Sequence, residues 1–243
     1  MPEEKRQRGR PRRLVSPAGR KRDSLVEISV DTIKEAALKM TAEMSLEDIS
    51  FVQVAKKLGA TTGSVHYHAG SREEFLSLVI NAAYKDIWTQ FDRGRASNDW
   101  AAEFSRAMHI FRKVLLKHAG VASYLISNNK FRIFQSVTGN EVDYGVMIAD
   151  RLFSVMRDGG LTKHQAAQCW HITYLFLLSS VQAEVAGTLP SAHRTFLTTR
   201  GSAARQKGRD GLAFGLDGLS KLNPEKTFSV GLKALLAPYK QPS

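Results

Sequence analysis

The sequence predicts an all-α protein, and three observations support that prediction. Several segments repeat apolar residues at intervals near 3.6, as one face of an amphipathic helix requires. Ser or Thr followed three residues later by Glu or Gln marks helix starts, and Gly marks helix ends. No segment shows the alternation typical of a half-buried strand. The 243 residues, 43% of them hydrophobic, suffice for one small domain and one larger helical domain.

A basic arm opens the chain. Residues 1–22 carry nine Lys or Arg against two Glu, which accounts for +7 of the net charge of +12. Because it has little to bury, this arm is expected to be disordered and to be attracted to a polyanion. Its Arg8-Gly9-Arg10-Pro11 core resembles the AT-hook, so Arg8 and Arg10 are candidates for insertion into a narrow A·T minor groove. Sequence-independent attraction to phosphates is the alternative.

Residues 23–70 are expected to form a three-helix DNA-binding domain. The first helix is predicted over about 23–44, and two short helices follow over about 51–57 and 62–68. Two short helices around a Gly-containing turn are typical of the helix-turn-helix unit, whose second helix enters the major groove of DNA.

Local signals set the ends of the two short helices. Ser50 and Gln53 form a capping box at the start of the first, and Gly59 can end it. Thr61 can cap the second, which is the expected recognition helix.

Residues 71–243 are expected to form a second helical domain. Its first helix starts at a capping box of Ser71 and Glu74 and continues to about Asp92. Further helices are expected over about 99–118, 122–127, 140–158 and 162–186.

Two segments of the C-terminal part allow more specific predictions. The helix over 162–186 is apolar nearly all round in its middle, so it is expected to be buried between neighbours. The polar, glycine-bearing segment 187–212 is predicted to be a mobile loop. A near repeat of Gly-Leu segments follows at 214–219 and 230–235.

The segment over residues 28–80 resembles, without gaps, the DNA-binding domain of the tetracycline-repressor (TetR) family of transcriptional regulators. The positions that carry the resemblance are Ile33, Ala36, Ala37, Met40, Ile49, Ser50, Val54, Ala55, Leu58, Gly59, Gly63, Ser64, Val65, His68, Ser71, Arg72, Glu73 and Leu76. The resemblance implies a homodimer on a near-palindromic operator in double-stranded DNA. It also implies a C-terminal ligand-binding and dimerisation domain, with a small-molecule effector and a Gly-Leu helix near the dimer interface.

The matched motif implies which residues contact DNA. It exposes Thr62, Gly63, His66 and Tyr67 and turns Val65 inward. Thr62 offers a hydroxyl and a methyl group to a base edge, and Gly63 permits close approach. The candidates for phosphate contact are Ser50, Gln53, Thr61, Ser64, Tyr67, His68 and Arg72. Residues two apart on a helix point in different directions, so His66 and His68 are not expected to hold a metal.

Aromatic and Met side chains of the second domain are candidates for the wall of an effector pocket, although plain core packing would use the same residues. The candidates are Trp88, Phe104, Met108, Phe111, Tyr124, Tyr144, Met147, Trp170, His171 and Tyr174. His171 and Tyr174 are the candidates for polar anchors, because they lie three apart on an otherwise apolar helix.

Other functions lack their usual signals. Motifs of hydrolases, metalloproteases and nucleotide-binding enzymes are absent, so neither an enzyme nor a cofactor or metal is expected. A single cysteine, no signal peptide and no long uninterrupted apolar run suggest a cytoplasmic, nucleoid-associated protein without a membrane partner. The expected function is a sequence-specific regulator, most simply a repressor released by an effector. An effector-independent chromosome-organising protein, an activator and a protein-only interaction module are alternatives.

Overall fold

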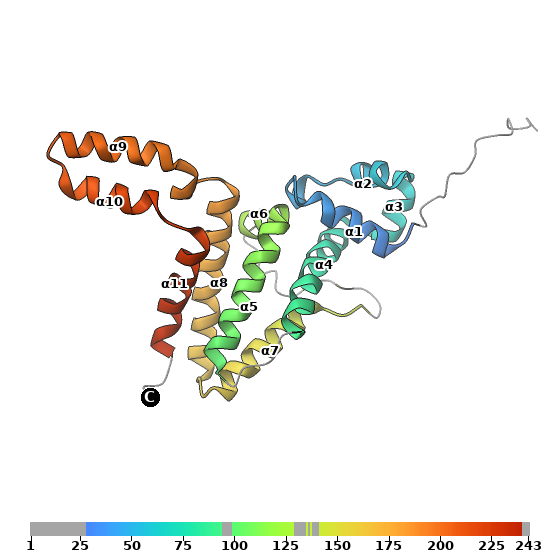
Figure 1. The fold of residues 1–243 in the computed structure, drawn as a ribbon. Helices are drawn as coiled ribbons and strands as arrows, with labels where there is room; N and C mark the ends of the chain where they lie inside the picture. The colour runs from blue at the N-terminus through green and yellow to red at the C-terminus, as the bar shows by residue number, and fades with distance from the viewer. Residues whose placement is uncertain (1–27, 94–98, 129–134, 136, 138–140, 240–243) are drawn as a thin grey trace, which may run out of the picture.

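The computed structural model describes residues 28–93, 99–128, 135, 137 and 141–239, which form helices and no strand (Figure 1). The predicted all-α class is confirmed. The basic arm over residues 1–22 and the beginning of the expected first helix lie outside the described residues.

The N-terminal domain, called the head below, contains three short helices. They are α1 (Val30–Met40), α2 (Phe51–Leu58) and α3 (Thr62–Ala69), with the 3-10 turn η1 (Leu46–Asp48) between α1 and α2. Helix α1 ends short of the predicted residue 44, because the hydroxyl of Thr41 donates to the carbonyl of Leu38 at 2.6 Å and the chain then turns to bury Leu46. The head core formed by these elements is fully apolar at its centre, where Ile33 and Val54 are inaccessible to solvent.

Helix α4 (Arg72–Asp92) belongs to both domains. Near its start, the ring of Phe75 packs edge-on against Phe51 of the head, with ring centroids 5.1 Å apart. Near its end, Phe91 lies under the guanidinium of Arg106 from the C-terminal domain, 4.5 Å from ring centroid to Cζ. Both phenylalanines of α4 are buried, so this helix cannot move without disturbing the packing of both domains.

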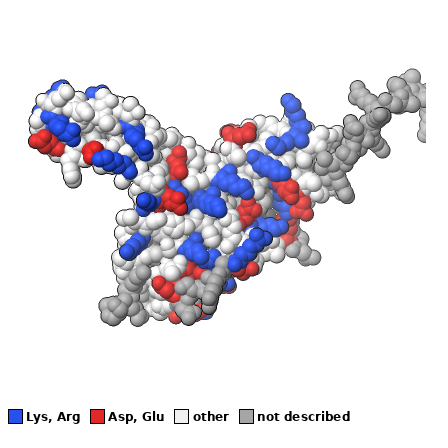
Figure 2. Space-filling model, viewed as in Figure 1, with Lys and Arg blue, Asp and Glu red and all other residues white. Residues whose placement is uncertain are grey.

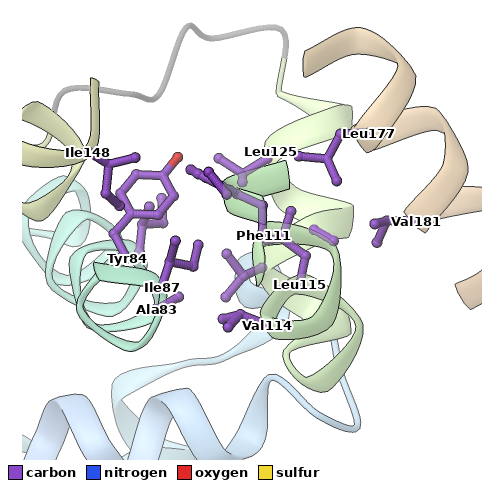
Figure 3. Packing of buried hydrophobic residues seen from close by; sticks show 14 of the residues in the cluster. Ala83, Tyr84, Ile87, Phe111, Val114, Leu115, Leu125, Ile148, Leu177 and Val181 are labelled. Atoms are coloured by element: carbon purple, nitrogen blue, oxygen red, sulfur yellow. The ribbon is translucent and has the colours of Figure 1, made fainter. Parts of the chain in front are cut away.

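The C-terminal domain, called the body below, packs around the second half of α4. Its helices are α5 (Trp100–Lys117), α6 (Ala119–Ser127), α7 (Tyr144–Asp158), α8 (Lys163–Val185) and α11 (Pro224–Leu236), followed by the 3-10 turn η3 (Ala237–Tyr239). Figure 3 shows Tyr84 pointing from α4 toward Phe111 of α5 and Leu125 of α6. The three side chains are buried and join these helices in one apolar core.

The predicted mobile loop over 187–212 is wrong, because most of the segment is helical. It holds the 3-10 turn η2 (Pro190–His193) and α9 (Arg194–Gln206), and α10 (Asp210–Ser220) begins before it ends. Helices α9 and α10 form a hairpin that projects from the body (Figure 1).

Small residues explain why the hairpin forms. Gly201 and Ala204 of α9 and Ala213 of α10 are its buried residues at the helix contact, where small side chains permit close packing. Gly208 makes the turn with φ +66°, and the N–H of Arg209 donates to the carbonyl of Ala204 at 2.9 Å. The glycines that suggested a loop therefore serve a helix crossing and a helix end.

The sequence predicted that helix α8 is buried on all sides. This prediction is wrong, because one side of the helix is exposed. Cys169 and Leu177 face the core, whereas Ile172 and Leu175 are exposed, Leu175 to 52%. The helical stretch Lys163–Gln206 also contains an 18-residue window with a mean hydropathy of 1.3, long and apolar enough to cross a membrane. A search for uninterrupted apolar runs misses this window. One such helix is weak support for a membrane span, since α8 packs its other face on α5, α6 and α11.

Head and body meet in a tight joint where α6 begins. The N–H of Gly120 donates to the carbonyl of Thr41 at 2.7 Å, and a Cβ at Gly120 would lie 1.9 Å from the carbonyl oxygen of Met44. His118 is buried beside this contact, with Nε2 3.4 Å from Oδ2 of Asp86 on α4. Burial lowers the pKa of His118, so the imidazole stays neutral at pH 7.

A pair of hydrogen bonds from one side chain joins α4 to the start of α7. The buried amide of Asn81 donates to the carbonyl of Val142 at 2.9 Å and accepts from the N–H of Tyr144 at 3.0 Å. Beside it, Lys34 of α1 forms an ion pair with Glu141. The head is therefore tied to the body at a second place beside α4.

Gly120→Ala is expected to destabilise the protein by roughly 1–3 kcal/mol, as overpacking does, because backbone rather than a flexible side chain must move. Gly215→Ala in α10 is the matched control. Nothing lies within 4 Å of a Cβ at Gly215, so this change should be neutral or stabilising by up to about 1 kcal/mol. Urea unfolding measures both variants, and equal losses of stability would contradict the tight joint.

Candidate nucleic-acid interface

Local hydrogen bonds and one left-handed glycine build the α2–α3 unit. The N–H of Gln53 donates to Oγ of Ser50 at 3.2 Å, and the N–H of Ser50 donates to Oε1 of Gln53 at 2.7 Å. The predicted capping box is therefore present. Gly59 ends α2 with φ +66°, and Oγ1 of Thr61 accepts from the N–H of Ser64 at 3.2 Å. These bonds fix the turn that orients α3 against α2.

Helix α3 exposes the face that the sequence predicted. Thr62, Gly63, His66 and Tyr67 are exposed, Tyr67 to 84%, whereas Val65 is fully buried. Figure 1 places α3 at the end of the head that lies away from the body. A DNA duplex can therefore reach this face without any change in the packing of the head.

Two further features shape this face. A Cβ at Gly63 would meet nothing within 4 Å, so the fold does not require glycine there. Because glycine has no side chain, a DNA atom has room to approach the backbone at this position. The rings of His66 and His68 lie edge-on against Phe51 and Tyr67, each with centroids 5.2 Å apart. Within the described part of the chain, no group of three or more His, Cys, Asp or Glu could hold a metal ion.

Arg72 holds the turn around η1 together. Its guanidinium donates to the carbonyl oxygens of Ile49, Leu46 and Glu47, the last two at 3.2 and 2.6 Å. It also lies over the ring of Phe75 at 5.3 Å. Burial lowers the pKa of Arg72. The carbonyl oxygens around η1 need donors when packed against protein, and Arg72 supplies them, so it has a structural role here, while its contact with a phosphate stays a prediction.

The sequence interpretation also passed over two basic residues. Lys56 and Lys57 are exposed on the last turn of α2, directly before the turn that leads to α3. A pair of lysines inside a helix-turn-helix match was the signal that could have found them. Figure 2 shows Lys and Arg side chains over head, body and hairpin, with Asp and Glu between them. The other predicted basic contacts, Arg8 and Arg10, lie outside the described residues.

The predicted effector-pocket residues differ in burial. Phe104, Met108, Phe111, Tyr124 and Trp170 are buried, Trp88, Tyr144, Met147 and Tyr174 are half-buried, and His171 is exposed. The buried group forms part of the body core and needs no ligand to explain its presence.

A hollow of about 660 Å³ lies between α6 and α8. His171 and Tyr174, the two predicted polar anchors, both line it, together with Leu125 and Ile126 of α6. Gln182 also lines the hollow, and its Oε1 atom is buried without a hydrogen-bond partner in the structure. The walls are mostly apolar with few polar groups, as small-molecule sites usually are.

Tyr174 connects this hollow to α4. Its ring stacks on Trp170 with centroids 5.9 Å apart, and its hydroxyl interacts with the side chain of Tyr84 on α4. Burial raises the pKa of Tyr174, and the interaction with Tyr84 partly opposes that rise. A ligand that displaces Tyr174 would therefore disturb its interaction with the helix that carries the head.

Comparison with known proteins places this geometry in context. A family profile described as "Tetracyclin repressor-like, C-terminal domain" matches residues 94–240. Apo ActR from Streptomyces coelicolor is similar with a TM-score of 0.67 and 18% identity, over 89% of this chain and 96% of that chain. ActR, a TetR family protein, has a further structure with actinorhodin that gives a TM-score of 0.67 and 18% identity, over 88% of this chain and 97% of the other.

A second protein, BioQ, shares the fold. Mycobacterium smegmatis BioQ gives a TM-score of 0.55 and 15% identity, over 88% of this chain and 98% of that chain. BioQ with its natural double-stranded DNA operator gives a TM-score of 0.50 and 17% identity, over 81% and 100% of the two chains. No curated protein matches the chain significantly. At these identities the solved structures establish the fold alone.

Replacing Thr62, His66 and Tyr67 together by Ala is expected to weaken operator binding at least about 100-fold, since each good base contact contributes roughly 1–3 kcal/mol. Thermal unfolding should be unchanged, because the three side chains are exposed. Fluorescence anisotropy with labelled operator measures the affinity. His164→Ala, at an exposed site in the body, is the control. Equal affinity of the triple variant and the control would contradict the interface.

Proposed function

The chain belongs to the tetracycline-repressor-like (TetR) family of DNA-binding transcriptional regulators, and we propose that it is a repressor whose operator binding is relieved by a small-molecule effector. The exposed face of α3 is the observation that carries the DNA-binding part of this proposal. Thr62, Gly63, His66 and Tyr67 would contact base edges or phosphates. Ser50, Gln53, Thr61, Ser64 and His68 would position the head on the phosphate backbone.

The operator in this proposal is a near-palindromic site in double-stranded DNA, bound by a homodimer. Ile172 and Leu175 of α8 and Val230 of α11 are exposed, and α11 packs against α8. Exposed apolar surface on neighbouring helices supports a protein interface there. In Figure 1 these helices lie on the side of the body opposite the head, so a twofold axis beside them would leave both α3 helices free for DNA.

Release by an effector is supported by the route from the hollow to the head. An effector bound between α6 and α8 would contact Tyr174, whose hydroxyl interacts with the side chain of Tyr84 on α4. A shift of α4 would change the separation of the two heads. A coupling of roughly 1–3 kcal/mol would change operator affinity about 5- to 150-fold. The structure of ActR with actinorhodin supports a small-molecule ligand for this fold.

The remaining parts of the proposal follow from composition. The regulator acts in the cytoplasm on the nucleoid, has no catalytic activity and uses no cofactor. Its basic arm adds affinity through Arg8 and Arg10, either in the minor groove or by attraction to phosphates.

Specific binding is expected to exceed non-specific binding by at least about 10³-fold at physiological salt. Selection of genomic fragments by the purified protein, followed by competition binding, measures this ratio. A ratio near one would instead favour a chromosome-organising protein. The position of the selected site relative to a promoter separates a repressor from an activator.

Tyr174→Phe is expected to leave operator affinity unchanged and to reduce the effector response to less than half, because it removes the hydroxyl that interacts with the side chain of Tyr84. Operator titration against a small-molecule panel that includes actinorhodin first identifies an effector and then measures its response. Tyr239→Phe, at a half-buried tyrosine near the chain end, is the matched control. A full response in Tyr174→Phe would reject this route.

A further inference from the structure

The α9–α10 hairpin has its large apolar side chains on the outside. The buried contact between its helices uses Gly201, Ala204 and Ala213, whereas Phe196, Leu212 and Phe214 are exposed, Phe214 to 83%. A two-helix unit of this length, with little apolar surface buried, is not expected to be stable by itself in water. The outward side chains therefore indicate that another surface covers the hairpin.

The position of the hairpin argues against its own body as that surface. The hairpin is inserted between α8 and α11, and Figure 1 shows it projecting from the body on the side opposite the head. Its helices pack mainly on each other and on η2. Helix α9, with 13 residues, gives the hairpin a reach of about 20 Å at 1.5 Å per residue. A second copy packed on α8 and α11 would lie within that reach.

The charge of the hairpin identifies a matching surface on that second copy. Arg205, Lys207 and Arg209 surround the turn between α9 and α10 and are exposed. A hollow of about 510 Å³ lies beside the joint of head and body, with Glu43 in its wall and Glu184, which already pairs with Arg112, beside it. Glu47 and Asp48 are exposed on η1, a few residues further along the chain. The basic end of the hairpin is complementary to the carboxylates of Glu43, Glu47 and Asp48 at and near this hollow.

The same hollow also suits the apolar side chains of the hairpin. Met44, Leu116 and Val185 line it, alongside Ala42 and Gly120. It opens near the end of α8, the helix from which the hairpin leaves through η2. The twofold arrangement proposed above would therefore direct the hairpin of one protomer across the axis toward this hollow on the other. Nucleic acid fits this surface less well, because charged phosphates cannot bury the apolar side chains of an exposed Phe and Leu.

We propose that the α9–α10 hairpin of each protomer crosses the twofold axis and docks on the hollow between head and body of a second copy of this chain. The inference rests on the homodimer of the proposed function. The hollow includes Gly120, whose N–H bonds Thr41 of the head. The docked hairpin thus holds the partner's head from outside and couples the positions of the two heads.

Cysteine cross-linking tests the contact directly. The native Cys169 is buried, and burial raises its pKa to about 12, so it does not compete with introduced thiols. The variant Lys207→Cys with Ala42→Cys, treated with a short bismaleimide, should give a covalent dimer in at least about fivefold higher yield than the control. The control pairs Lys207→Cys with Asp150→Cys, at an exposed position on α7.

A second measurement separates docking from a failure to fold. Phe214→Ser should raise the dimer dissociation constant at least about tenfold in sedimentation equilibrium, as loss of a central aromatic anchor does. Tyr67→Ser is the matched control, because Tyr67 is 84% exposed, close to the 83% of Phe214, but lies on α3. Circular dichroism confirms that both variants are folded.

The outcomes distinguish this inference from the proposed function. A protein that is dimeric and binds its operator, yet gives no excess cross-linking and no effect of Phe214→Ser, would overturn the docked hairpin alone. A monomer would overturn both the hairpin and the homodimer. Cross-linking that appears only with DNA present, together with loss of DNA affinity in Phe214→Ser, would reassign the hairpin to the nucleic acid.

Discussion

The burial of α4 in both domains is the constraint on which the rest of the structure depends. Phe75 at one end fits among the head helices, and Phe91 at the other is enclosed by the body. Between them, Tyr84 interacts with Tyr174, and Asn81 clamps the start of α7. Close-packed interiors do not deform continuously, so a displacement of α4 in the body is passed to the head as a rigid movement.

The joint at Gly120 limits which movements are possible. The backbone contact with Thr41 leaves no space for a side chain, and His118 fills the region between α1 and α4. A movement of the head relative to the body must therefore strain or break this contact. In the proposed dimer, such a movement changes the distance between recognition helices, and operator spacing converts that distance into affinity.

Features that depend on neighbours in the chain could be predicted from the sequence. The capping box of Ser50 and Gln53, the helix end at Gly59 and the cap at Thr61 each involve residues at most a few positions apart. The exposed face of α3 was implied by the resemblance of residues 28–80 to the DNA-binding domain of the TetR family. In the C-terminal domain, the resemblance noted in the sequence implied only a helical architecture. The family match of this domain came from the comparison with the family profile.

Features that depend on distant residues could not be predicted. Arg72 bonds carbonyl oxygens 23 to 26 residues away in the chain, so its inward orientation has no local signal. The hairpin was mistaken for a loop because Gly201 and Ala213 matter only once two helices meet. The exposed side of α8 also depends on distant residues, because the positions of α5, α6 and α11 decide which of its apolar residues are covered.

Hydroxyl-radical footprinting of the operator tests the central claim, that α4 positions paired recognition helices for DNA. The account predicts two protected patches on one face of the duplex, centred about 34–36 Å or one helical turn apart. Both patches should disappear together when Thr62, His66 and Tyr67 are replaced by Ala. A single patch, or protection without a fixed spacing, would contradict it.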